Sequence, residues 1–173
     1  MRLTIAFLFF ISWTNSFSCD CKTNGLKALQ GWSYSESPLI FVGDVLTSNP
    51  KTGTYKIKIV EIFKGQTKTT IIEGKGLTSC SGFPDKGRWI IYAETYKNGV
   101  IDFNSCGLSR AFDNPQFIMA TEYKIPPPPT KESETDSKYS IQANIDFQRA
   151  VLKLKDTALT DLEIEIEDLR KRK

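Results

Sequence analysis

The chain has 173 residues, of which 40% are hydrophobic and 25% charged, and its net charge is +3. This length accommodates one domain of ordinary size plus an appendage, and so small a charge does not indicate a nucleic-acid-binding protein. The sequence contains no histidine. That absence excludes Ser-His-Asp and Cys-His catalysis and any histidine-ligated metal site.

Residues 1–18 have the pattern of a secretory signal peptide. Arg2 supplies a positive charge, Leu3 to Trp13 form an apolar stretch, and small serines precede the expected cleavage site. The stretch is shorter than the about 20 residues that a membrane span needs, and no later segment is long and apolar enough to cross a membrane. We therefore expect a secreted mature chain that begins at Cys19, located outside the cell, or in the periplasm or at the surface if the source is bacterial. Lipid attachment to Cys19 remains an alternative, although it would leave an odd number of cysteines.

The region from Leu39 to about Phe103 has the pattern of β structure, with a largely apolar, β-branched run at Leu39–Leu46 and strict alternation at Tyr55–Ile59. The sequence predicts five strands, at Leu39–Leu46, Tyr55–Phe63, Thr69–Glu73, Arg88–Tyr96 and Val100–Phe103. In the second strand the alternation slips where Ile59 and Val60 adjoin, which predicts a bulge. Asn98–Gly99 predicts a tight hairpin turn. Five antiparallel strands suit a small barrel, and a short helix is expected at Gly25–Ser35.

The last quarter of the chain differs in composition. Residues 125–138 contain four consecutive prolines and a polar tract, which predict a linker. Residues 139–173 predict an amphipathic helix. Its apolar stripe consists of Ile145, Leu152, Leu159, Ile166, Leu162 and Leu169. The main interpretation is a helix that rests on the barrel or extends into solvent. Self-association through a coiled coil and contact with a foreign partner are the alternatives.

The four cysteines are Cys19, Cys21, Cys80 and Cys106. In a secreted chain they are expected to form structural disulfides, and a redox dithiol or a thiolate metal site is the alternative. A bond between Cys19 and Cys21 would close a tiny strained ring, so each should pair with one of the two distant cysteines. Each long loop closed in this way would stabilise the fold by roughly 4 kcal/mol in the chain-entropy model.

With histidine absent, pairs of carboxylates are the candidate catalytic groups that the sequence still offers. Glu163 with Glu165, and Asp102 with Asp113, could in principle act as general acid and base. We interpret all four as solvated surface charges. The chain is therefore predicted to be no enzyme, and to have no cofactor and no metal of its own.

Several segments, taken in order, resemble the inhibitory domain of the tissue inhibitors of metalloproteinases and the wider netrin-like module. The resemblance rests on the N-terminal Cys-x-Cys, on two later cysteines, and on segments 39–45, 55–65, 88–93 and 104–106. It covers about Cys19 to Leu108, and the second segment includes the family's terminal Phe-Lys-Gly. The lysine-rich, histidine-free composition suggests a single-domain relative, for which a bacterial source is one candidate.

This resemblance implies an oligonucleotide/oligosaccharide-binding (OB) barrel over residues 19–124 with disulfides Cys19–Cys80 and Cys21–Cys106. It further implies that the free amino group and carbonyl oxygen of Cys19 chelate the zinc of a target metalloendopeptidase. Asp20 would enter the protease's specificity pocket. The expected inhibitory edge is Cys19, Asp20, Cys21, Thr78 and Ser79. A non-inhibitory binding or adhesion module remains the alternative, because Asp20 is charged where the family commonly has Ser or Thr.

Overall fold

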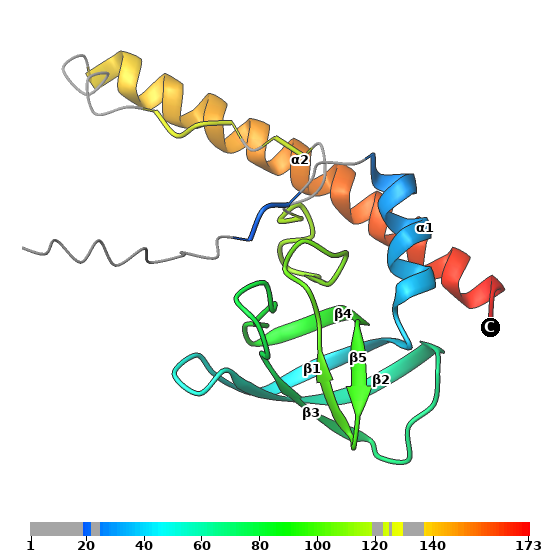
Figure 1. Cartoon of the computed structure of the whole chain (residues 1–173). Helices are drawn as coiled ribbons and strands as arrows, with labels where there is room; N and C mark the ends of the chain where they lie inside the picture. The colour runs from blue at the N-terminus through cyan, green and yellow to red at the C-terminus, as the bar shows by residue number, and fades with distance from the viewer. Residues whose placement is uncertain (1–18, 22–24, 119–122, 125, 130–136) are drawn as a thin grey trace, which may run out of the picture.

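A computed structural model of the chain describes residues 19–21, 25–118, 123–124, 126–129 and 137–173. The predicted signal peptide and most of the polar tract of the predicted linker lie outside the described residues. The elements in chain order are α1 (Leu26–Glu36), β1 (Leu39–Asn49), β2 (Thr54–Lys64), β3 (Ile71–Lys75), β4 (Gly87–Ala93), β5 (Thr95–Lys97), β6 (Val100–Asp102), β7 (Arg110–Ala111) and α2 (Ser137–Lys171). The chain is thus mainly β with a long C-terminal helix, as predicted, and α1 and α2 lie on the same side of the sheet (Figure 1).

The strands form one mixed sheet of seven strands in the order β5-β6-β3-β2-β1-β4-β7. The predicted five antiparallel strands are therefore only partly right. The fourth predicted strand divides into β4 and β5 at Glu94, β7 adds an edge strand, and β3 and β6 run parallel. The hydrogen-bonded order ends at β5 and β7 and does not close. The residue pattern locates a strand but carries no information about its neighbour, which is why the expected antiparallel pairing is wrong for β3 and β6.

The long strands β1 and β2 bend because their register is interrupted. Val42 pairs with Glu61 and Gly43 with Ile59, which leaves Val60 as an extra residue. The predicted bulge is thereby confirmed, and two further register shifts occur along the same pair of strands. Each bulge increases the local twist, so the sheet curls strongly. The predicted tight turn between β5 and β6 is also confirmed, because Asn98 (φ 55°) and Gly99 (φ 79°) are both left-handed.

The central strands β1 and β4 are buried on both faces for most of their length, whereas β2 and β3 have one exposed face. One core lies between the sheet and the helices and contains Leu29, Ile40, Val42, Phe63, Ile90, Tyr92, Leu108, Ile118, Leu162 and Leu169. The other lies inside the curl and contains Leu39, Phe41, Val45, Tyr55, Ile57, Ile72, Ile91, Ala93, Ile101 and Phe103. Successive residues of β1 and β4 alternate between these cores. Strands buried on both faces read as continuous apolar runs, and this explains the unbroken hydrophobic stretches in the sequence.

A buried polar cluster joins α2 to the sheet and to α1. The carboxylate of Glu165 accepts hydrogen bonds from both terminal nitrogens of Arg110 (3.1 and 3.2 Å), from the Tyr92 hydroxyl (2.9 Å) and from Gln30 Nε2 (2.8 Å). Arg110 is 2% and Glu165 4% exposed. Burial, together with the adjacent Glu165 carboxylate, raises the pKa of Tyr92 far above its ordinary value. This cluster fixes which face of α2 meets the sheet.

Charged side chains hold the C-terminal end of α2 against the sheet and α1. Arg170 binds both carboxylate oxygens of Glu61 on β2, at 2.8 and 3.1 Å. The guanidinium of Arg172 and the ammonium of Lys64 each lie within 5 Å of the Tyr34 ring centre. The C-terminal part of the helix therefore rests on the folded body, in agreement with the main interpretation from the sequence.

Candidate functional site

The candidate site is the N-terminal segment Cys19–Cys21, which two disulfides tie to separate loops. Cys19 bonds to Cys80 and Cys21 to Cys106, with Cα separations of 5.2 and 5.3 Å. This is the pairing that the family resemblance implies. The two bridges adjoin, since Cys19 Sγ lies 3.6 Å from Cys106 Sγ. Figure 1 shows the segment in dark blue beside the loops that follow β6.

The loop that carries Cys80 is organised by a buried carboxylate. Asp102, 7% exposed at the end of β6, accepts hydrogen bonds from the Ser81 hydroxyl (2.7 Å) and from the backbone amide of Leu77 (3.2 Å). The Ser81 hydroxyl in turn accepts from the amides of Leu77 and Thr78, both at 2.9 Å. These bonds satisfy the amides of a loop without regular structure, so Cys80 is held in one position.

A second turn positions Cys106. The side-chain oxygen of Asn104 accepts the backbone amide of Cys106 (2.8 Å), which is the geometry of an Asx turn. Ser105 joins this turn to the first loop, because its amide (2.8 Å) and its hydroxyl (3.0 Å) both donate to the carbonyl oxygen of Cys80. The two disulfide-bearing loops therefore form one hydrogen-bonded unit beneath the N-terminal segment.

The other predicted edge residues lie at the surface of this unit. Asp20, between the two half-cystines, is exposed, and so are Thr78 and Ser79 directly before Cys80. Thr78 uses its hydroxyl to accept the amide of Cys80 at 3.2 Å. Leu77, 61% exposed, is an apolar side chain at the same edge that the sequence analysis did not single out. The disulfide between Cys19 and Cys80 brings the exposed Asp20 near the exposed Thr78 and Ser79.

The interpretation of the acid pairs as solvated surface charge is wrong for Asp102 and Glu165, since both are buried. Each serves the packing of the chain, Asp102 by holding the loop of Cys80 and Glu165 by pairing with Arg110. Glu165 could have been found from its place, three residues from Leu162 and four from Leu169, on the apolar stripe of α2. The short polar residues that flank Cys80 and Cys106 were the signal for the two supporting turns.

The arrangement of the four cysteines tests the alternative that they form a redox dithiol or a thiolate metal site. The sulfurs of Cys19, Cys21 and Cys106 all lie within 4.8 Å of one another. All four cysteines are bonded in disulfides, and metal ligation by cysteine requires thiolates. In this oxidised form the site is therefore a structural support for the N-terminal segment.

Within the described part of the chain, no helix combines the length and the apolar character that crossing a membrane requires. No protein-family model and no curated protein sequence matches the chain.

Proposed function

We propose that this chain is a secreted inhibitor of zinc endopeptidases that acts through the amino group of Cys19 once residues 1–18 have been removed. The observation that carries the proposal is the double anchoring of the segment Cys19–Cys21. A disulfide on either side of Asp20 leaves that side chain exposed while fixing the backbone before and after it.

The chemistry of the first residue fits this role. An α-amino group has a pKa of about 7.7–8, so about a tenth or more of it is neutral and able to donate to a metal at physiological pH. A catalytic zinc keeps an open coordination position, and the amino nitrogen and carbonyl oxygen of Cys19 would occupy it in place of water. The bonded loops that carry Cys80 and Cys106 limit the entropy lost when the segment docks.

We further propose that the curled sheet is an OB-type barrel, as in the netrin-like modules. The support comes from β4 and β5, which lie near opposite ends of the strand order yet are separated by Glu94 alone. The amide of Glu94 donates to the carbonyl oxygen of Asp102 on β6 at 2.9 Å. The chain itself thus connects the two sides of the sheet, and the barrel would close along this segment.

The test is inhibition of a panel of zinc endopeptidases by the exported protein, with serine and cysteine endopeptidases as negative controls. N-terminal sequencing and intact mass first establish that the sample begins at Cys19 without an acyl group. We expect inhibition of at least one zinc enzyme. One extra alanine before Cys19 should abolish it, because the amide nitrogen that replaces the amino group cannot donate to the zinc.

Asp20→Ser is the matched variant for the pocket contact, because it restores the residue type common in the family. It should strengthen inhibition, since burying a carboxylate in an apolar pocket is costly. Equal inhibition by the protein with and without the extra alanine would overturn the chelation mechanism. The absence of inhibition across the panel, by a sample with the correct N-terminus and intact disulfides, would overturn the proposed function.

The second candidate is a binding or adhesion module without inhibitory activity. The exposed carboxylate of Asp20 and the largely exposed N-terminal half of α2 favour it. It predicts that the protein binds a partner and that an extra alanine before Cys19 leaves the affinity for this partner unchanged.

A further inference from the structure

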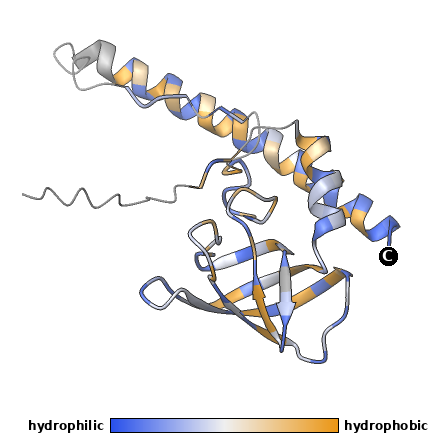
Figure 2. Ribbon diagram, in the orientation of Figure 1, coloured by the Kyte–Doolittle hydropathy of each residue, from blue (hydrophilic) through white to orange (hydrophobic). Residues whose placement is uncertain are grey.

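Helix α2 carries a second apolar stripe, which lies beside the buried one and is exposed. Where its side chains are described, the first buried residue is Ala158, followed by Leu162, Glu165 and Leu169. The exposed stripe consists of Ile141 (62% exposed), Ile145 (41%), Leu152 (63%) and Leu159 (40%). The single stripe expected from the sequence is thus two, because Leu162 and Leu169 belong to the core. Figure 2 shows hydrophobic residues recurring along α2 well beyond the part beside α1.

The exposed stripe runs into a groove at the docked part of the helix. The groove is lined by the apolar residues Phe112, Leu159, Leu162 and Ile166, together with the polar residues Asp156, Thr160, Glu163, Glu167 and Arg170. Leu159 belongs to both features, so the stripe and the apolar part of the groove adjoin and together form one surface. Its N-terminal half presents protruding side chains, and its C-terminal half presents a hollow. Two copies related by a twofold axis perpendicular to the helix would therefore place the protruding half of one against the hollow of the other.

We propose that this surface binds a second copy of the chain, with the two α2 helices antiparallel and the twofold axis at Leu159. Leu152 and Ile166 each lie seven residues from Leu159. The twofold axis therefore places Leu152 of each copy in the partner's groove, beside the partner's Ile166. The contact is isologous and closes as a dimer, since each copy supplies the same protrusion and the same hollow. This inference does not depend on the proposed inhibition.

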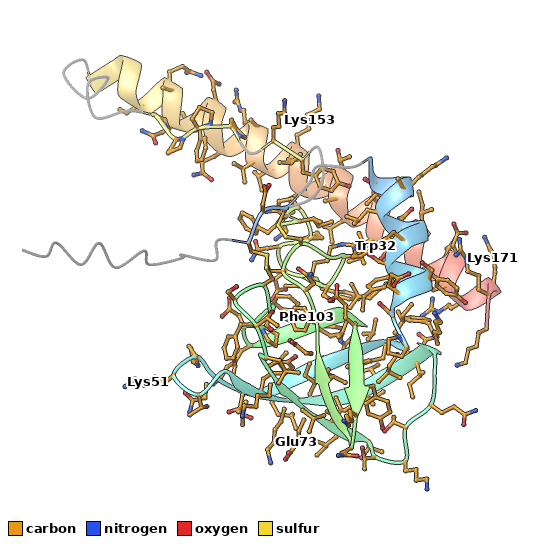
Figure 3. All side chains as sticks on the ribbon, viewed as in Figure 1. Trp32, Lys51, Glu73, Phe103, Lys153 and Lys171 are labelled. Carbon is orange, nitrogen blue, oxygen red and sulfur yellow. A yellow bond between two sulfur atoms is a disulfide. The ribbon has the colours of Figure 1, made fainter. Side chains whose placement is uncertain are left out.

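The charges beside the stripe favour the antiparallel direction. On the flank away from the core, Arg149 and Lys153 lie N-terminal to Leu159 together with Asp156, and Glu163 and Glu167 lie C-terminal to it. Arg149 also pairs with Asp146 of its own helix at 3.7 Å. Lys153 and Glu163 form no salt bridge with any residue that the structure describes. Figure 3 shows Lys153 directed away from the sheet. In an antiparallel pair this flank meets the same flank of the partner, so Lys153 lies near the partner's Glu163 and Arg149 near the partner's Glu167.

A parallel pair would lose these contacts. It would bring the charged flank of one helix against the other flank of its partner, which carries the core residue Leu162. A membrane surface is a poorer occupant as well, because helices that lie on anionic lipid carry lysine and arginine on the polar face. Here Asp156, Glu163 and Glu167 stand beside the stripe together with Arg149, Lys153 and Arg170, so its charges are of both signs and not mainly basic. The second copy is the occupant that satisfies both the groove and the charges.

The first test is the oligomeric state of the full exported chain, measured by sedimentation equilibrium over a range of concentrations. We expect a reversible dimer that Leu152→Asp weakens by at least tenfold. Ile164→Asp is the matched control, because Ile164 is 53% exposed on a different face of the same helix, and it should leave the dimer unchanged. Far-UV circular dichroism and urea unfolding check that both variants keep the fold.

The second test is the direction of the pair. Lys153→Glu and Glu163→Lys should each weaken the dimer, more so at low salt, and the double variant should restore it because both pairs are then reversed together. A monomer at every concentration, or a dimer insensitive to Leu152→Asp, would overturn the proposal. A double variant as weak as the two single ones would overturn the antiparallel register.

Discussion

Removing the carboxylate of Glu165 should destabilise the whole domain, because this group connects α2 to the rest of the molecule. Glu165→Ala deletes the acceptor of four hydrogen bonds, two of them from Arg110. Arg110 is 2% exposed and would remain as a buried charge without a counter-ion. Breaking a buried ion pair in this way costs about 3–5 kcal/mol.

That cost is a large fraction of the roughly 5–15 kcal/mol that stabilises a typical protein. For a chain of this size it corresponds to a fall in melting temperature of roughly 6–20 °C. The measurement is urea and thermal unfolding followed by circular dichroism. Asp168→Ala is the control, since this carboxylate is exposed on the same helix and bonds to Lys171. It should stay within about 0.5 kcal/mol of the wild type.

A second variant separates the ion pair from simple loss of packing. Arg110→Met combined with Glu165→Leu replaces both charges by apolar groups of similar size. It should unfold at a higher urea concentration than Glu165→Ala alone, because no unpaired charge is left buried. A free-energy change below about 1 kcal/mol for Glu165→Ala would refute the reasoning, since it would mean that Arg110 finds water or another partner without cost.

Three further predictions concern the loops, the end of α2 and the disulfides. Asp102 accepts at both of its oxygens, since Oδ2 takes the Ser81 hydroxyl and the Leu77 amide and Oδ1 takes the Phe103 amide. Asp102→Asn turns one of these oxygens into an NH2 donor, which leaves at least one of the donors without an acceptor, and should cost about 1–3 kcal/mol in urea unfolding. Asp113→Asn at an exposed site should cost little. The hydrogen bond from Arg170 holds the pKa of Glu61 below its usual 4.5, so this pair stabilises the fold above that pH, and its contribution is lost as the pH falls through the lowered pKa. The melting temperatures of the wild type and Glu61→Gln should therefore differ at pH 7 and converge in acid. A difference that stays constant with pH would contradict the ion pair between Glu61 and Arg170. The folded protein should contain no free thiols and no bound zinc, and reduction should cost roughly 4 kcal/mol per disulfide in the chain-entropy model. A reactive thiol in the folded protein would contradict the structural role of the cysteines.

The sequence alone predicted the elements whose signals are local. Alternation located the strands, the slip at Ile59–Val60 located a bulge, and Asn98–Gly99 located a turn. The recurrence of apolar residues every seven positions predicted a helix over residues 139–173, and α2 begins at Ser137, close to that start. Each of these features depends on residues close together in the chain, so a single sequence contains the information needed to find it.

The tertiary structure decided everything that depends on which distant residues meet. It set the parallel pairing of β3 with β6, and it divided the apolar residues of α2 between a buried stripe and an exposed one. It also buried Asp102 and Glu165, which local composition could not distinguish from surface acids. The physical reason is that a charge is stable in a core only if partners surround it, and those partners, Ser81 for one and Arg110 for the other, come from remote parts of the chain.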